Sequence, residues 1–349
     1  MRPSDESKSK DQFASETQSY RRELLAHCYR MLGSAQEAED LVQETYLRAF
    51  RAYEGFEGNA SMRSWLYTIA TNVCLSALAS RRSRVLPSGL TASYEGPERP
   101  AVFVPPGEVS WLEPLPDAWT EVTVDDPGTI AIERESLRLA LIASLQYLAP
   151  RQRAIFLLRE VLAFSAEEAA QILATSTPAI KSGLQRARAR LDEVMPKREA
   201  LLQPTDPRAL ELLNGYIAAF ERSDANLLLS VLRADATLEA TPFRDWVTGR
   251  AKCIQLLEKY VLGAPGDWRM LVTRANGQPA AALYRRDANG ALTGYGLVVL
   301  AATDTGVASV VAFHDPALVK VFGFSDSFSR DESKTSVLEN SVAGVPGVE

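Results

Sequence analysis

Cysteine and long hydrophobic runs are both scarce in this 349-residue chain. Its three cysteines, Cys28, Cys74 and Cys253, are scattered and odd in number, which matches neither a disulfide framework nor a paired-cysteine metal clamp. We expect them to be buried as small apolar residues. The longest apolar run, residues 297–302, is too short to span a bilayer, and the polar N-terminus lacks the apolar segment of a secretory signal. The sequence therefore predicts a cytoplasmic protein with no membrane segment, no metal site and no cofactor.

The net charge of −6 is distributed unevenly along the chain. Residues 1–84 carry a net charge of +1 and residues 129–199 carry +3, whereas residues 85–128 carry −7 and residues 200–349 carry −3. The hydrophobic content of 46% is that of a soluble globular protein, and the length suits two or three domains. An acidic tether thus separates two weakly basic blocks, and an acidic block follows.

The first block has the periodicity of amphipathic helices. One apolar stripe runs from Tyr20 to Leu32 and stops at Gly33, a residue typical of a left-handed C-cap. Ser34 and Glu37 then predict a capping box at the start of a second helix over residues 38–53. A third helix is predicted over residues 62–82, with Trp65 on its buried stripe.

The acidic stretch 85–128 holds too many closely spaced prolines for a helix and is predicted to be a linker. One part of it is too apolar for a solvated tether. That patch consists of Trp111, Leu112, Pro114, Leu115, Pro116 and Trp119. We expect it to dock, and the C-terminal domain is the predicted surface.

Helices resume over residues 133–163, with Pro150 at a first turn, and Ser165 with Glu168 predicts a second capping box. A last helix follows a short turn. Thr177 is its predicted N-cap because it precedes Pro178, and Ser176 is the alternative one residue earlier.

This last helix is notable for the absence of any acid over residues 175–191. Its apolar residues fall on one narrow stripe, whereas the open side carries Lys181, Ser182, Gln185, Arg186, Arg188 and Arg190. Two short helices, the second basic outside, are typical of a DNA-binding helix-turn-helix. The alternative is a solvated basic face on an ordinary bundle helix. Such faces usually mix charges of both signs for i,i+4 pairing, which favours the DNA-binding interpretation.

The final block begins with helical patterns over residues 206–232 and 249–263. Short β-rich segments punctuated by Asn-Gly and Thr-Gly turns follow. This order predicts an α+β domain with a curved sheet of antiparallel strands. The Ser- and Gly-rich tail from Ser325 is predicted to be disordered. The expected fold class is multidomain, with two all-α domains and a C-terminal α+β domain.

These segments, in this order, resemble the extracytoplasmic-function sigma factors of the sigma-70 family. The matching stretches are AEDLVQETYLRAFRAY, SWLYTIATNVCL, LAPRQRAIFLL, FSAEEAAQIL and AIKSGLQRARARL. The rest resembles the subgroup with a C-terminal SnoaL-like domain of the NTF2-like fold. The resemblance implies sigma region 2 at residues 13–84, the linker at 85–128, region 4 at 129–199, the SnoaL-like domain at 204–324 and a tail at 325–349.

The family also implies a role for each helical surface, with core RNA polymerase and promoter DNA as partners. Asp40, Gln43, Glu44 and Arg48 would bind the polymerase clamp helices. Asn59, Ser61, Arg63, Trp65 and Asn72 would melt and read the minus-ten element, although core packing is the commoner role for a residue such as Trp65. Thr177, Lys181, Ser182, Gln185, Arg186, Arg188 and Arg190 would read the minus-35 element. In the family, the acidic linker threads the polymerase channel.

Two residues depart from the family pattern. Ala174 stands in the helix-turn-helix turn where glycine is frequent, and Gly183 interrupts the recognition helix, at a cost of up to about 1 kcal/mol relative to alanine.

Two other functions compete with promoter recognition by a polymerase subunit. SnoaL-like enzymes need a pocket acid or histidine, and His314, Asp315, Asp245 and Asp235 are the candidates, but they form no recognisable constellation. A regulator that binds DNA without polymerase would leave the clamp-binding helix without a purpose. For the C-terminal domain we expect control in cis, with a small ligand or regulator as its possible effector.

Overall fold

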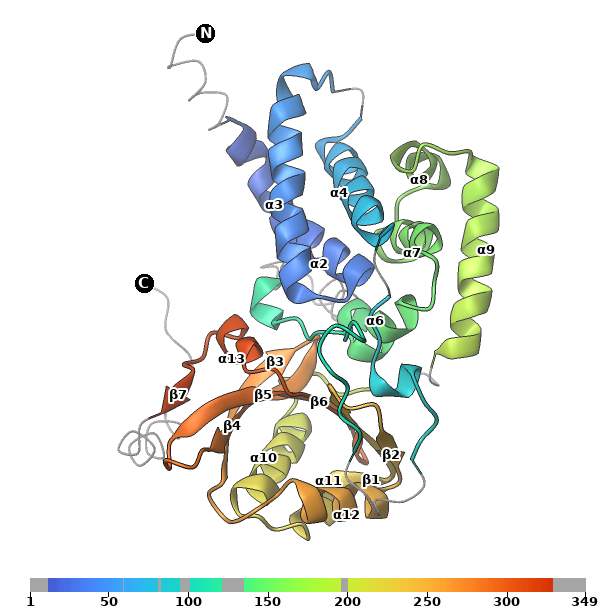
Figure 1. Ribbon diagram of the computed structural model, residues 1–349. Coiled ribbons are helices and arrows are strands. Elements are labelled where there is room, and N and C mark those ends of the chain that lie inside the picture. The colour runs from blue at the N-terminus through green and yellow to red at the C-terminus, as the bar shows by residue number, and fades with distance from the viewer. Residues whose placement is uncertain are drawn as a thin grey trace. The chain divides into compact units, whose positions relative to one another are not determined.

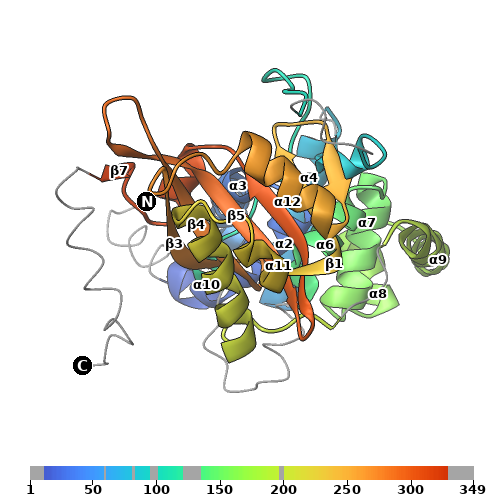
Figure 2. The same cartoon turned by 90° about the horizontal axis from the view of Figure 1, so that it is seen from below.

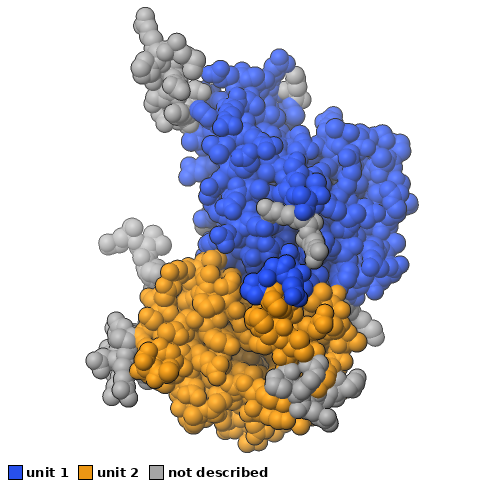
Figure 3. Space-filling model, in the orientation of Figure 1, with its two compact units in different colours: residues 1–85, 106–198 blue, residues 86–105, 199–349 orange. Residues whose placement is uncertain are grey.

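The computed structural model describes residues 12–58, 60–80, 83–94, 101–120, 135–195 and 200–328. The chain divides into two compact units (Figure 3). The helical unit comprises Met1–Val85 and Pro106–Arg198, and the C-terminal unit comprises Leu86–Pro105 and Glu199–Glu349. Within the described residues, no helix is both long and apolar enough to cross a membrane.

The first half of the helical unit is a bundle of three α-helices, α2 (Arg21–Leu32), α3 (Ala35–Ala52) and α4 (Met62–Leu78) (Figure 1). Gly33 ends α2 in the predicted left-handed conformation, with φ of 73°. Ser34 caps α3 by accepting the Glu37 amide, but Glu37 pairs with Arg84 at 3.1 Å rather than completing the predicted box. Cys28 and Cys74 are buried in this bundle, as predicted.

The second half contains α6 (Leu139–Leu145), α7 (Pro150–Phe156), a π-helical turn η5 (Leu157–Val161), α8 (Ala166–Ile172) and α9 (Thr177–Val194). Ser165 and Glu168 form the complete capping box predicted for α8. The guanidinium of Arg153 is fully buried and donates to the carbonyls of Gln146 and Leu148, to the Gln146 side chain and to the Met31 carbonyl of α2. Arg153 therefore joins the two halves of the unit.

The C-terminal unit is an α+β domain, which confirms the predicted fold class. Its elements are η3 (Pro87–Gly89), α10 (Pro207–Glu221), α11 (Leu227–Val231), β1 (Leu232–Thr241), β2 (Trp246–Thr248), α12 (Arg250–Tyr260), β3 (Trp268–Ala275), β4 (Gln278–Arg286), β5 (Leu292–Thr303), β6 (Gly306–Phe313), α13 (Ala317–Val321) and β7 (Ser327–Phe328). Figure 2 shows α10, α11 and α12 on one face of the sheet. Leu213, Tyr216 and Phe220 of α10 join the core formed there with Val298 and Leu300.

The described strands form one sheet in the order β2-β1-β6-β5-β4-β3, with β7 on β5. The expectation of an entirely antiparallel sheet is wrong, because β1 and β6 pair in parallel. Their pairing spans some 70 residues of sequence, so no local turn signal reports it. The predicted disordered tail also begins too early, since Ser327 and Phe328 pair with β5. The rest of that tail lies outside the described residues.

The acidic linker is divided between the two units. Leu112 and Leu115 of the apolar patch are buried in the helical unit, at 0% and 1% exposure. Tyr29 donates to the Glu113 carbonyl at 2.8 Å, and Ser34 donates to the Glu113 carboxylate at 2.6 Å. The prediction that Trp111, Leu112, Pro114, Leu115, Pro116 and Trp119 dock on the C-terminal domain is therefore corrected. Near the turn between α2 and α3, the hydroxyl groups of Tyr29 and Ser34 bond to Glu113, and the neighbouring core buries Leu112 and Leu115.

Gly296 of β5 generates a stability prediction. Its φ is 156°, and a Cβ at this position would lie 1.9 Å from the Phe313 carbonyl oxygen of β6. We expect Gly296→Ala to destabilise the C-terminal unit by about 3 kcal/mol or more, measured by amide hydrogen exchange in β5 and β6. Gly290→Ala, at a position with open space around it, is the control and should cost about 1 kcal/mol. Equal costs for the two variants would contradict the steric argument.

Candidate nucleic-acid interface

Helix α9 presents its basic side chains because its apolar stripe is fixed against the rest of the helical unit. Ile180, Leu184, Ala187 and Leu191 are buried, as the periodicity predicts. Ser176 is the N-cap, with its hydroxyl accepting the Ala179 amide at 3.4 Å. The prediction of Thr177 as the cap is therefore wrong by one residue: Thr177 begins the helix.

The opposite side of α9 is open and cationic. Lys181, Gln185, Arg186, Arg188 and Arg190 are exposed, and Ser182 and Thr177 are half-buried. Arg188 pairs with Glu160 at 2.7 Å, and Arg190 pairs with Glu193 at 2.8 Å. Among the described residues, Lys181 and Arg186 have no ion-pair partner. Exposed pairs contribute little, so Arg188 can exchange Glu160 for another anion at small cost.

The backbone at Ala174 and the packing at Gly183 account for the two departures from the family pattern. Ala174 has a φ of 46°, the left-handed conformation that glycine adopts without strain. Gly183 lies where α9 crosses α7, and a Cβ there would come within 2.6 Å of the Ile155 side chain. The missing side chain therefore permits close packing of α9 on α7.

Helix α3 carries the residues predicted to bind polymerase on its solvent side. Asp40, Gln43 and Arg48 are exposed, and Arg48 pairs with Glu44 at 2.7 Å. Leu47 lies on the same side and is 54% exposed. Sequence reasoning missed Leu47, although a single leucine among the polar residues of an amphipathic helix is a readable signal.

The predicted minus-ten residues are only partly brought together. Ser61 caps α4 by accepting the Ser64 amide at 3.1 Å, and Asn72 is exposed further along the helix. Trp65 is half-buried and packs against the ring of Phe56, with centroids 4.8 Å apart. Asn59 lies outside the described residues.

Arg63 does not point freely into solvent. Its guanidinium donates to Glu23 of α2 at 3.0 Å and lies 4.6 Å from the ring centroid of Phe164. Nearby, burial and the charges of Arg30 and Arg63 lower the pKa of His27 from 6.5 to about 3. His27 is therefore neutral at physiological pH and adds no further positive charge beside Arg63.

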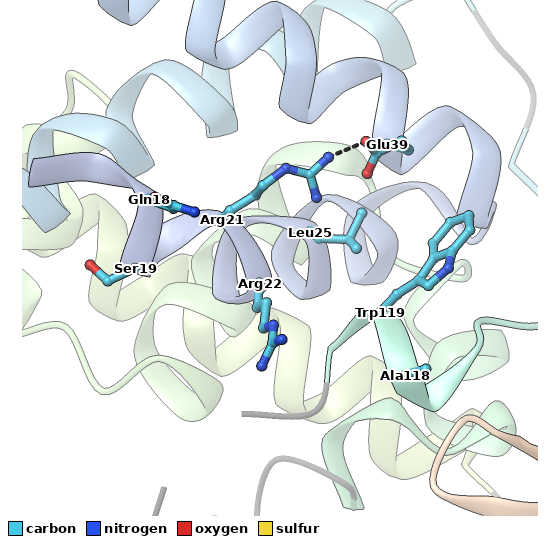
Figure 4. Close-up of a pocket in the computed structure, with 8 residues that line it drawn as sticks. All are labelled: Gln18, Ser19, Arg21, Arg22, Leu25, Glu39, Ala118 and Trp119. Carbon is cyan, nitrogen blue, oxygen red and sulfur yellow. Dashed lines mark hydrogen bonds and ion pairs between the residues drawn. The ribbon is translucent and has the colours of Figure 1, made fainter. Parts of the chain in front are cut away.

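A cavity of about 740 Å³ opens beside the N-terminal end of α3. Its lining residues are Gln18, Ser19, Arg21, Arg22, Leu25, Glu39, Ala118 and Trp119. Figure 4 shows Leu25 between the paired Arg21 and Glu39 on one side and the Trp119 ring on the other. The end of the linker patch therefore forms a wall of this cavity.

The candidate acid and base residues of the C-terminal unit are not brought together. Asp245 accepts the Val102 amide at 2.7 Å, Asp315 accepts the Ala317 amide at 3.0 Å, and Asp235 pairs with Arg233. The His314 ring packs against Phe243 and Tyr295, and burial followed by the Arg285 charge lowers its pKa to about 4. Each group thus has a local structural role.

Two helical halves, the second a helix-turn-helix with an exposed basic helix, define a multidomain DNA-binding protein. Residues 17–84 match the Sigma-70 region 2 family, and residues 138–191 match Sigma-70, region 4. The chain is 48% identical to the ECF RNA polymerase sigma factor SigG of Mycobacterium tuberculosis, over 90% of this chain and 84% of that protein. The chain therefore belongs to the extracytoplasmic-function sigma factors of the sigma-70 family. It is a promoter-directed transcription initiation factor and not an enzyme.

A second M. tuberculosis relative supports the whole-chain architecture. SigJ is 29% identical over 64% of this chain and 63% of that protein. The crystal structure of SigJ matches 89% of this chain and 100% of that chain, with a TM-score of 0.56 and 22% identity. The combination of helical halves with a C-terminal α+β domain is therefore shared with a solved fold.

The strained turn generates a prediction on stability. Ala174→Gly should stabilise the helical unit by about 0.5–1 kcal/mol, because glycine tolerates the positive φ. Ala189→Gly, on the exposed side of α9, should instead destabilise it by about 1 kcal/mol. Urea denaturation of the two variants measures both effects. Destabilisation by Ala174→Gly would refute the assignment of strain to this turn.

Proposed function

We propose that α9 reads the minus-35 element while the start of α4 engages the minus-ten element and α3 binds core RNA polymerase. The observation that carries the proposal is the open cationic side of α9, where Lys181 and Arg186 are exposed. An α-helix fits the major groove, where arginine or lysine can pair with guanine and glutamine with adenine. Gln185 and Arg186 are adjacent in α9, so the helix carries one side chain that can pair with adenine and one that can pair with guanine.

The α3 surface suits helix-to-helix docking on polymerase. Asp40 and Gln43 offer polar contacts, and the exposed Leu47 supplies an apolar anchor among them. An apolar side chain surrounded by polar groups is typical of the centre of a binding surface. Because core polymerase acts on the chromosome, the proposed site of action is the cytoplasm.

The C-terminal unit is proposed to control this activity in cis through residues 86–105, here called the linker loop. Its first part is held by four polar contacts, one of which is the Thr91 hydroxyl donating to the Arg244 carbonyl at 3.0 Å. The Ser88 amide donates to Glu239 at 3.0 Å, Trp246 donates through its indole nitrogen to the Thr91 carbonyl at 2.8 Å, and the Tyr94 amide donates to the Trp246 carbonyl at 2.7 Å. Glu239 is only 7% exposed, so the Ser88 amide satisfies a buried carboxylate.

The second part of the linker loop lies along the connection between β1 and β2. The Arg244 amide donates to the Val102 carbonyl, and the Val104 amide donates to the Pro242 carbonyl, both at 2.9 Å. Phe103 packs edge-on against Phe243. A ligand or regulator that binds this part of the unit with preference for one state would shift how firmly the loop is held.

The ends of the linker loop are fixed within the helical unit. Val85 pairs in parallel with Trp111, and the Leu112 amide donates to the Val85 carbonyl at 3.0 Å. Once a change in the C-terminal unit releases the loop, the pairing of Val85 with Trp111 alone keeps the path between the two DNA-reading halves short, and loss of that pairing lengthens it. This coupling supports the proposal of cis control.

Removing two cations from α9 tests its proposed role. Arg186→Ala combined with Arg188→Ala should lower promoter affinity of the holoenzyme tenfold or more, and should reduce the slope of log affinity against log salt by about 2. Filter binding across salt concentrations measures both quantities. Arg208→Ala, which removes a half-exposed, ion-paired arginine from α10, is the matched control and should change neither. A tenfold loss of affinity with an unchanged salt slope would count against phosphate contact.

The purified chain alone separates a polymerase subunit from an independent DNA-binding regulator. Run-off transcription with core polymerase should begin at a cognate promoter, whereas the chain without polymerase should not bind the duplex tightly at physiological salt. Tight binding without polymerase would favour the independent regulator.

Deleting residues 204–349 tests control in cis. The truncated protein should tolerate changes of about two base pairs between the minus-35 and minus-ten elements better than the full chain, because its linker loop has lost its anchor. Trp246→Phe, which removes one hydrogen-bond donor to the loop, should increase the tolerance to altered spacing of the two elements by a smaller amount. Asn289→Ala, in the hairpin between β4 and β5, is the control. Identical spacing profiles and outputs for full-length and truncated protein would rule out the proposed control.

A further inference from the structure

The cavity beside α3 combines an apolar floor with polar and aromatic walls. Leu25 of α2 is buried and forms the floor, and Figure 4 shows Arg21 and Trp119 on opposite sides of it. Gln18 and Ser19 complete the polar wall. The volume of about 740 Å³ lies within the range of roughly 300–1,000 Å³ that small-molecule sites occupy. The cavity therefore has the size and the mixed lining of a ligand site.

The walls of the cavity are fixed by other parts of the helical unit. Tyr46 of α3 donates to the Thr17 carbonyl at 2.7 Å, which holds the start of the polar wall. Trp119 ends the 3-10 turn η4 (Asp117–Trp119), and this turn closely follows the buried Leu115. Because these walls are already held in place, a ligand need not order them when it binds.

The charges of the lining favour an anion. The guanidinium groups of Arg21 and Arg22 face only one carboxylate, that of Glu39. The side chains of the paired Arg21 and Glu39 are 45% and 24% exposed, so Arg21 can turn to the anion of a ligand at small cost. A guanidinium binds a carboxylate or a phosphate through two parallel hydrogen bonds. A cationic ligand would instead meet a surplus of positive charge.

Trp119 offers a surface for a planar ring. Its side chain is half-buried, and its indole N–H makes no hydrogen bond within the part of the chain that the structure describes. Aromatic rings and nucleobases stack on such a face. The Gln18 amide and the Ser19 hydroxyl likewise have no side-chain hydrogen bond among the described residues, so they can bind polar substituents of the ring.

We propose that this cavity binds a small molecule that joins a planar aromatic ring to a phosphate or a carboxylate. The ring lies on Trp119 and the anion on Arg21. This site belongs to the helical unit and is separate from the effector considered for the C-terminal unit.

Glu39 connects the cavity to the polymerase-binding surface of α3. Its oxygen Oε1, which pairs with Arg21, also accepts from the Gln43 amide at 3.4 Å. A ligand that takes Arg21 leaves Glu39 as a stronger acceptor for Gln43, which keeps that amide from polymerase. The occupied chain therefore binds core polymerase less tightly. This step rests on the proposed function of α3.

Calorimetric titration of the full chain tests the class of ligand. AMP and salicylate, the phosphate and carboxylate probes, each carry a ring and an anion. Ribose 5-phosphate carries the anion alone, and tryptamine carries a ring with a positive charge. AMP or salicylate should bind about tenfold more tightly than both of the others, because the ring and the anion each add a contact. The tighter of the two identifies the anion. No binding, or equal binding of all four, would overturn the proposal.

Substitutions then locate the probe. Arg21→Gln and Trp119→Leu should each weaken its binding about tenfold, whereas Trp119→Phe, which keeps a ring, should weaken it by less than about threefold. Glu39→Gln should strengthen binding, because Arg21 loses its competing carboxylate. Arg208→Gln, at a half-exposed and ion-paired arginine of α10, is the matched control. If Trp119→Leu unfolds the linker, the opposite effects at Arg21 and Glu39 carry the test. An equal loss in the control would contradict binding in this cavity.

The affinity for core polymerase, measured with and without the probe, tests the coupling. Saturating probe should raise the dissociation constant of the holoenzyme about threefold, and core polymerase should weaken probe binding by the same factor. Glu39→Gln should bind the probe yet lose this effect. An unchanged dissociation constant would overturn the coupling. A wild-type chain that binds the probe but not core polymerase would refute the proposed function instead and leave the ligand site standing.

Discussion

The buried guanidinium of Arg153 is the interaction on which the helical unit depends. A charge removed from water must be surrounded by acceptors, and Arg153 obtains them from the turn before α7 and from the end of α2. Burial lowers its pKa from 12.5 to about 10, so it remains charged at physiological pH. Because its own domain supplies most of its acceptors, the charge organises the helix-turn-helix and needs the first half only for the Met31 carbonyl.

The same division between local and distant partners recurs across the protein. Arg188 is paired by Glu160, Arg63 by Glu23, and the Ser34 hydroxyl by both the Glu37 amide and Glu113. In each case an element formed by local sequence is fixed by a group far away in the chain. Exposed or half-exposed partners of this kind are exchangeable, which suits a protein whose surfaces are proposed to bind polymerase and DNA.

Locally encoded features could be predicted from the sequence. The left-handed Gly33, the Ser165 capping box and the cationic side of α9 depend on neighbours within a few residues, and all are present. The pairing of β1 with β6, the contact of Arg63 with Phe164 and the docking of Glu113 join segments that only the tertiary structure brings together. The apolar character of the linker patch indicated that it would dock, but a leucine pair does not specify its partner. Ser34 and Tyr29, placed by the α2–α3 corner, make that choice together with Arg84, which pairs with Glu113 at 2.9 Å.

Both ends of the linker loop are held in the helical unit, and this affects how readily the loop rebinds to the C-terminal unit. Residues 86–105 leave the helical unit next to the point at which they return, where Val85 pairs with Trp111. Tethering at both ends makes rebinding to the β1–β2 connection intramolecular, with an effective concentration in the millimolar range for short flexible tethers. A free peptide of the same sequence would therefore compete poorly, whereas a single proteolytic cut within the loop would remove one tether and make its release far easier.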